Sequence, residues 1–184
     1  MVKPIIRAAL LLFSFTLMGA AHAQKFYANE NSNDGIDPRS SYRFEDYHAP
    51  TPHTVPGAKT IHTEELYKTL QGDNKPLLID VLGGPPHQTL SGAIWWPGSG
   101  VGHKGESASA DALTKFTRKL DELTGWDKAR PVVFFCLSNQ CWLSYNASLR
   151  ALAGGYTNVM WYRGGLESWK AAGNAAAASG ASKY

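Results

Sequence analysis

The sequence predicts an α/β fold: a single domain with a doubly wound parallel sheet and helices on both faces. Three observations predict this class. Short apolar runs typical of buried strands alternate with segments of helical periodicity along residues 58–173, the connections are short, and the runs end at turn residues. In such sheets ligands bind beyond the carboxyl ends of the strands, so the residues after each strand are the first candidates for function.

The ends of the chain are predicted to lie outside this domain. Residues 1–23 resemble an export signal, with Lys3 and Arg7 before an apolar run and a small-residue cleavage site at 21–23. The run is shorter than the roughly 20 residues that span a bilayer. We therefore expect cleavage, a periplasmic location and no stable membrane span; an uncleaved anchor is the alternative. Residues 174–184, rich in Ala, Ser and Gly, are predicted to be a flexible tail.

Residues 24–57 read as a polar, turn-rich N-terminal arm. This segment has five aromatic residues, too many for a fully solvated tail, so we expect part of it to pack on the domain; a disordered leader is the alternative. These aromatic residues are Phe26, Tyr27, Tyr42, Phe44 and Tyr47.

Charge excludes two classes of partner. The chain has 18 Lys and Arg against 15 Asp and Glu, a net charge of +3, and without Lys3 and Arg7 it has 16 against 15, or +1. No basic stripe points to nucleic acid, and no helix with a basic face points to a membrane surface. We expect proteins or small molecules as partners, and no cofactor is implied.

The first half of the domain begins with a helix. Residues 63–70 start with a capping threonine and early acids, which predicts a short helix. Residues 77–82 are apolar except for Asp80 and end at a Gly-Gly-Pro-Pro turn, as expected for a strand buried on both faces. Residues 93–96 are expected to form a second short strand before a glycine-rich turn.

The second half alternates in the same way. Residues 110–124 place leucine and phenylalanine at helical spacing and stop at a glycine, which predicts a helix. A strand is expected at 131–135, a helix at 142–152, a strand at 158–162 and a final helix at 166–172.

The only two cysteines, Cys136 and Cys141, lie on one short loop directly after the 131–135 strand. A sulfur at a strand's carboxyl end and before a helix can have a favoured thiolate, because the helix N-terminus is positive. We expect Cys136 to be a partly exposed working sulfur, with the N–H groups of residues 137–142 as an anion cradle; a buried structural cysteine is the alternative. The cradle residues are Leu137, Ser138, Asn139, Gln140 and Trp142.

The spacing of this loop excludes other cysteine motifs. Four residues separate the cysteines, whereas a thioredoxin-like dithiol has two. Trp142 stands where a phosphatase loop needs arginine and where haem attachment needs histidine. His87 and His103 lack the paired spacing of zinc ligands, so no metal site is predicted.

Several separate blocks of sequence, in order, resemble the rhodanese-like domain over residues 58–173. They include Ile79-Asp80-Val81, Gly92-Ala93-Ile94, the strand ending in Cys136, and Tyr162-Arg163-Gly164-Gly165. The resemblance implies that Cys136 carries a persulfide and passes sulfur to a thiophilic acceptor, and that Asp80 braces the active loop. An ordinary polar role at the strand end is the alternative for Asp80.

More narrowly, the arm and the Cys141-Trp142 segment resemble periplasmic proteins of pyrroloquinoline-quinone (PQQ)-dependent alcohol catabolism that are named for a Cys-x-x-Cys-Trp motif. This resemblance implies a PQQ-dependent dehydrogenase or a cytochrome c as neighbour. The spacing departs from the name, since four residues separate the cysteines here.

Three further assignments concern the surroundings of the loop. Because residues 137–141 contain no cation, thiosulfate turnover should be poor; Arg163 is a candidate substitute cation, or a solvated side chain. Cys141 is a resolving thiol, half of a static bridge, or a small loop-filling residue. Trp95 and Trp96, with Trp142, form a pocket wall or belong to the core.

Two functions follow. The first is sulfane-sulfur transfer or thiol-disulfide exchange through Cys136 and Cys141, with a protein thiol or a small sulfur donor or acceptor as partner. The second is a non-catalytic periplasmic module that binds a quinoprotein dehydrogenase or cytochrome.

Overall fold

The computed structural model describes residues 24–102 and 110–178, so the predicted export signal and the end of the predicted tail lie outside the described residues. A five-stranded sheet in the order β1-β6-β5-β2-β4 forms the centre, and every pairing in it is parallel. Its strands are β1 (Lys59–Ile61), β2 (Leu77–Asp80), β4 (Ile94–Trp95), β5 (Val132–Phe135) and β6 (Val159–Tyr162). The predicted α/β class is confirmed.

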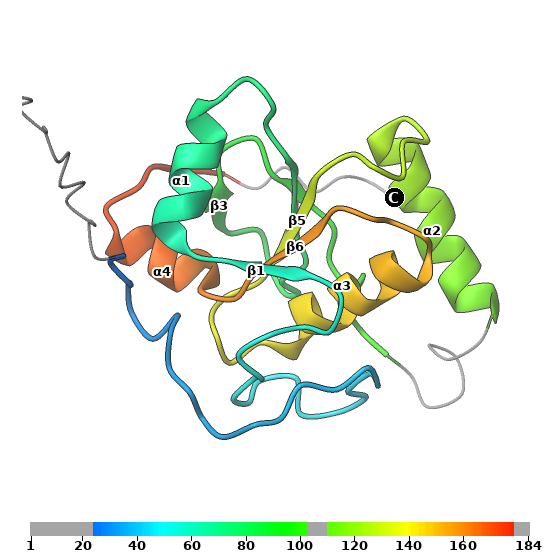
Figure 1. The fold of residues 1–184 in the computed structure, drawn as a ribbon, viewed down its shortest axis with the longest axis horizontal. Coiled ribbons are helices and arrows are strands. Elements are labelled where there is room, and N and C mark those ends of the chain that lie inside the picture. Colours follow the sequence, from blue (N-terminus) through cyan, green and yellow to red (C-terminus); the bar gives the residue numbers. More distant parts are fainter. Residues whose placement is uncertain (1–23, 103–109, 179–184) are drawn as a thin grey trace, which may run out of the picture.

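Helices cover both faces of this sheet (Figure 1). α1 (Thr63–Gln71) and α4 (Gly165–Ala171) pack on one face, and α2 (Ala110–Thr124) and α3 (Trp142–Ala153) on the other. The central strand β5 is buried on both sides because its side chains alternate between the two layers. Val132 and Phe134 belong to the cluster with α2 and α3, and Val133 and Phe135 to the cluster with α1 and α4.

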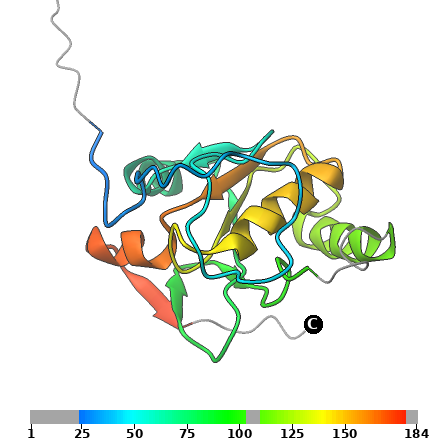
Figure 2. The same ribbon diagram turned by 90° about the horizontal axis from the view of Figure 1, so that it is seen from below.

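The N-terminal arm packs on the domain, as the aromatic content of residues 24–57 predicted. In Figure 2 the blue-to-cyan arm crosses over α3. α3 is buried around almost its whole circumference, and Trp142, Tyr145 and Leu149 cluster with Val55 of the arm. The sheet covers only one side of this helix, and the arm supplies cover on another side.

The short strands depart from the predictions. β1 had not been predicted, and β3 (Gln88–Leu90) pairs with β7 (Ala176–Ala178) in a separate antiparallel sheet. The prediction of a flexible tail is therefore wrong for residues 176–178. Alanine has little strand preference of its own, so this strand depends on its partner.

Candidate functional site

The two cysteines form a disulfide at the carboxyl end of β5. Cys136 directly follows the strand, Cys141 directly precedes α3, and their Cα atoms are 6.1 Å apart. Cys136 is 1% exposed and Cys141 5%. The expectation of a partly exposed thiol at Cys136 is therefore wrong for this bridged state.

The arm covers the loop by pairing with its backbone in antiparallel fashion. Trp142 N–H donates to Tyr47 O (2.8 Å), and Ala49 N–H donates to Gln140 O (2.9 Å). Between these bonds, His48 forms an isolated antiparallel bridge with Cys141. An extended segment that adds to a loop edge uses the backbone groups of both partners, so it fixes the loop and excludes water from it.

The predicted anion cradle is in part occupied by the protein itself. Besides Trp142 N–H, the N–H of Cys141 donates to Ser138 O (3.1 Å) and that of Gln140 to Ser138 Oγ (3.3 Å). Three of the six N–H groups at 137–142 therefore have partners within the chain. For these three groups, the expectation that they receive an anion is wrong in this conformation.

Arg163 lies at the carboxyl end of β6 and is 1% exposed. Its guanidinium donates five hydrogen bonds to the arm, which uses all the N–H groups that an arginine side chain has. The acceptors are Glu30 O (3.0 Å), Ser32 O (2.8 Å), Asp34 Oδ2 (3.2 Å), Thr51 O (3.0 Å) and Thr51 Oγ1 (3.1 Å). The prediction that Arg163 serves as a substitute cation for substrate is wrong here, because the arm occupies it.

Burial lowers the pKa of Arg163, while the nearby Asp34 carboxylate opposes this shift. A buried charge is tolerated only when it is paired and fully hydrogen-bonded, and both conditions hold here. Arg163 is thus the residue through which β6 anchors the arm.

Asp80, at the carboxyl end of β2, is fully buried and holds the segment that follows it. Its carboxylate accepts hydrogen bonds from Leu82 N–H (2.9 Å) and the Thr89 hydroxyl (2.6 Å), and pairs with His87 Nε2 (2.8 Å). The carboxylate therefore organises the chain from 82 to 89, and these three contacts of its oxygens lie away from the cysteine loop. Through its backbone, Val81 N–H donates to Phe135 O at the start of the loop (3.0 Å).

The three tryptophans predicted as a wall lie in different surroundings. Trp95 is buried, donates from Nε1 to Leu82 O (2.6 Å) and meets the His87 ring edge-on. Trp96 stacks on Phe116 and packs against the core cluster that contains both cysteines. Trp142 lies beneath the arm and donates from Nε1 to Pro50 O (3.0 Å), so the three tryptophans do not form one wall.

A cavity of about 390 Å³ lies beside the loop. Its lining includes Leu137 of the loop, Leu82 and His87 from the segment after β2, and Trp169 and Lys170 of α4. Neither cysteine lines it. Access from this cavity to the disulfide therefore requires the loop to move.

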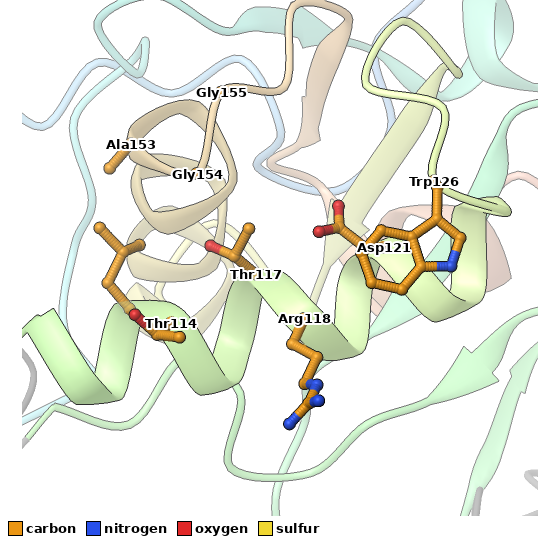
Figure 3. A pocket seen from close by; sticks show the side chains of 9 residues that line it. Thr114, Thr117, Arg118, Asp121, Trp126, Ala153, Gly154 and Gly155 are labelled. Atoms are coloured by element: carbon orange, nitrogen blue, oxygen red, sulfur yellow. The ribbon is translucent and has the colours of Figure 1, made fainter.

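A second cavity, of about 730 Å³, lies at the opposite end of the strands (Figure 3). Asp121 of α2 and Trp126 lie on one side of it, and Gly154 and Gly155 at the end of α3 on the other. Trp126 precedes β5 and Gly155 precedes β6, so this cavity is at the amino ends of the strands. Cys136 lies at the opposite, carboxyl end of β5.

Sequence reasoning missed the residues that hold the arm. The Tyr145 hydroxyl accepts from Arg39 N–H (2.8 Å) and donates to Arg39 O (2.7 Å), and Asn146 bonds both backbone groups of Arg43. The available signal was the polar tip of Tyr145 and the amide of Asn146 on a helix expected to pack on the sheet, since buried polar groups need partners.

Two further findings concern the described residues. Within 24–102 and 110–178, no three His, Cys, Asp or Glu side chains are close enough together to hold a metal ion. None of the helices described has the length and apolar character needed to cross a membrane.

The sequence matches the rhodanese-like domain over residues 62–172. A comparison with the curated proteins finds no match.

Several solved structures have a similar fold. The Rhodanese_3 like domain of a protein from Anabaena sp. is 17% identical, with 55% of this chain and 98% of that chain covered and a TM-score of 0.38. The polysulfide-sulfur transferase homodimer from Wolinella succinogenes is 16% identical, with 66% and 80% covered and a TM-score of 0.47. An EanB variant in complex with hercynine is 20% identical, with 72% of this chain and 34% of that chain covered and a TM-score of 0.50. At these identities the similarity concerns the fold.

Proposed function

The chain belongs to the rhodanese-like domain family, and from this premise we propose that it transfers sulfane sulfur through Cys136 and completes the reaction with Cys141. The observation that carries the proposal is the bond between these two residues, at the end of the central strand and before α3. The bond places a second thiol within reach of the first.

The first step starts from the reduced pair. The Cys136 thiolate attacks the outer sulfur of a persulfide or polysulfide donor, and the donor's sulfur–sulfur bond breaks. A persulfide donor leaves as a thiolate, and a polysulfide donor leaves as a polysulfide anion shorter by one sulfur. Cys136 then carries a persulfide. An acceptor thiolate can take the outer sulfur and return Cys136 to its starting state.

The second route uses Cys141. Its thiolate attacks Sγ of Cys136, the Cys136–Cys141 bond forms, and the outer sulfur leaves as hydrosulfide. The two thiols lose two electrons and the sulfane sulfur gains them, so no outside oxidant is needed. A dithiol reductant then restores both thiols.

The charge of the loop bears on the donor. Residues 137–141 include no cation, and Arg163 is turned toward the arm. A thiosulfate dianion therefore meets no counter-charge from these groups. We propose persulfides or polysulfides as donors in preference to thiosulfate.

Intact-mass spectrometry tests this function. After reduction and treatment with polysulfide, Cys141→Ser should gain the mass of one sulfur atom, because its persulfide has no resolving thiol. The wild type should release sulfide and return to the bridged mass, and Cys136→Ser should do neither. Absence of the sulfur adduct in Cys141→Ser together with absence of sulfide from the wild type would disprove the function.

We further propose a periplasmic location beside PQQ-dependent alcohol oxidation. The N-terminal residues 1–23 and the similarity of the arm and the Cys141-Trp142 segment support this context. Fractionation of cells that make the full chain, with sequencing of the mature N-terminus, tests the location. Detection of the protein in the cytoplasmic fraction with residues 1–23 still attached would overturn this proposal.

The burial of both sulfurs favours a second candidate, a non-catalytic module that binds a quinoprotein dehydrogenase or its cytochrome c. In that case the double Cys136→Ser, Cys141→Ser variant binds such a partner with the same affinity as the wild type, as measured by calorimetry. Sulfide release by the wild type would decide for sulfur transfer.

A further inference from the structure

We propose that residues 47–51, here called the strap, gate the Cys136–Cys141 bridge, so that a dithiol reductant reaches the bond only after the strap lifts and then attacks Cys141. This inference rests on the proposed function, because the gate acts on the step of that reaction in which the two thiols are restored. Its test uses reduction alone and involves no sulfur donor.

The strap lies along the loop through backbone pairing at both ends. Its first residue, Tyr47, accepts from Trp142 N–H, and its last, Thr51, donates from N–H to Asn139 O (3.2 Å). The Thr51 hydroxyl donates to the same carbonyl oxygen (2.6 Å). His48, between them, is the residue paired with Cys141. The strap therefore lies along the backbone of residues 139–142, which include Cys141.

Side chains of the domain fasten the strap from outside the loop. Arg163 Nε donates to Thr51 Oγ1, and Nη2 donates to Thr51 O. Trp142 Nε1 donates to Pro50 O (3.0 Å). These contacts come from β6 and α3, which stay in place as core elements, so the strap can lift as a unit without disturbing the sheet.

The backbones of the two cysteines make different contacts, although both side chains belong to the same core cluster. Cys136 is held on the side of α4, where Leu166 N–H donates to Cys136 O (3.0 Å). A side chain at Gly165, whose φ is +59°, would overlap the same carbonyl oxygen, so the backbone of α4 lies directly against it. Lifting the strap removes none of these contacts. It does remove the backbone pairing of His48 with Cys141, so Cys141 is the cysteine whose backbone is released, which makes its sulfur the point of attack.

A dithiol can reduce the Cys136–Cys141 disulfide in two steps of thiol–disulfide exchange. Its thiolate attacks Sγ of Cys141, the Cys136–Cys141 bond breaks, and Cys136 leaves as a thiolate at the end of β5. The second thiol of the reductant then attacks the mixed disulfide, closes the reductant's own disulfide and frees Cys141. The reductant supplies two electrons, and Cys136 is ready for a sulfur donor.

A matched pair of threonine variants tests the gate. Thr51 and Thr124 are both buried, 1% and 3% exposed, and each hydroxyl makes hydrogen bonds, but only Thr51 lies in the strap. Thr51→Val keeps the shape and loses two hydrogen bonds, which should raise the population of the lifted strap about tenfold. Thr124→Val is the control for loss of overall stability.

The measurement is the rate at which dithiothreitol reduces the bridge, read by alkylation and mass spectrometry. We expect Thr51→Val to be reduced about tenfold faster than the wild type, and Thr124→Val to be reduced at the wild-type rate. Equal rates for Thr51→Val and the wild type, or equal acceleration in both variants, would overturn the gate. These outcomes are independent of whether the chain forms a persulfide.

The attacked sulfur is identified with glutathione, which has one thiol and leaves a mixed disulfide. Peptide mapping of Thr51→Val after brief treatment should find glutathione on Cys141. Glutathione on Cys136 would overturn the assignment of the entry sulfur.

Discussion

Replacing Arg163 with lysine should destabilise the protein by detaching the arm from β6. The guanidinium donates five hydrogen bonds to the arm at 2.8–3.2 Å, and an ammonium has only three N–H groups, so at least two bonds are lost. A hydrogen bond to a charged group contributes about 1.5–3 kcal/mol. Taking the lower value for each lost bond, the free energy of unfolding should fall by about 3 kcal/mol.

Urea unfolding followed by far-UV circular dichroism measures this change, with Arg118→Lys as the matched control. Arg118 is exposed on α2, and its replacement by lysine should change the free energy of unfolding by less than about 0.5 kcal/mol. Limited proteolysis should also cut the arm sooner in Arg163→Lys. A loss below about 1 kcal/mol, within the ordinary range for a single hydrogen bond, would refute the assignment of Arg163 as the anchor.

Three other predictions concern the core and the bridge. Burial raises the pKa of Tyr156 to about 12. Because the pKa in the unfolded chain is about 10, the stabilisation by the neutral Tyr156 hydroxyl is complete below pH 10 and is lost as the pH rises toward 12. Tyr156→Phe should therefore flatten the pH dependence of the free energy of unfolding in this range, as measured by urea unfolding. Replacing Cys136 and Cys141 by serine should lower the free energy of unfolding by about 2 kcal/mol, because the bridge closes a short loop; an unchanged urea midpoint would contradict this. Asp80→Asn should lower the free energy of unfolding by about 2 kcal/mol, because the asparagine NH₂ group, a donor, takes the place of one carboxylate oxygen that accepts hydrogen bonds in a buried site. A thermal melt that matches the wild type would contradict this prediction.

The regular elements could be predicted because their signals are local. The expected helix at 110–124 has the same bounds as α2, and the expected strand at 131–135 differs from β5 by one residue. Apolar runs and helical spacing report burial along a single segment. β1, β3 and β7 have only three residues each, too few for a pattern, and they exist because a neighbouring strand pairs with them.

The candidate site could be predicted in part. The cysteine loop at a strand end was located from sequence, and the bridge was among the alternatives stated for Cys141. The exposure of Cys136 and the role of Arg163 were predicted wrongly. Both depend on the arm, whose contacts with the loop and with β6 join residues about a hundred positions apart.

The positions of the four helices and of the longer strands along the chain, and the position of the sulfur pair, were determined by the sequence alone, because each depends on side chains that are near one another along the chain. Which groups meet solvent was decided only by the tertiary structure. Residues 47–51 lie on the loop and Arg163 faces the arm because buried backbone and charged groups take whichever partners the fold brings within hydrogen-bonding distance.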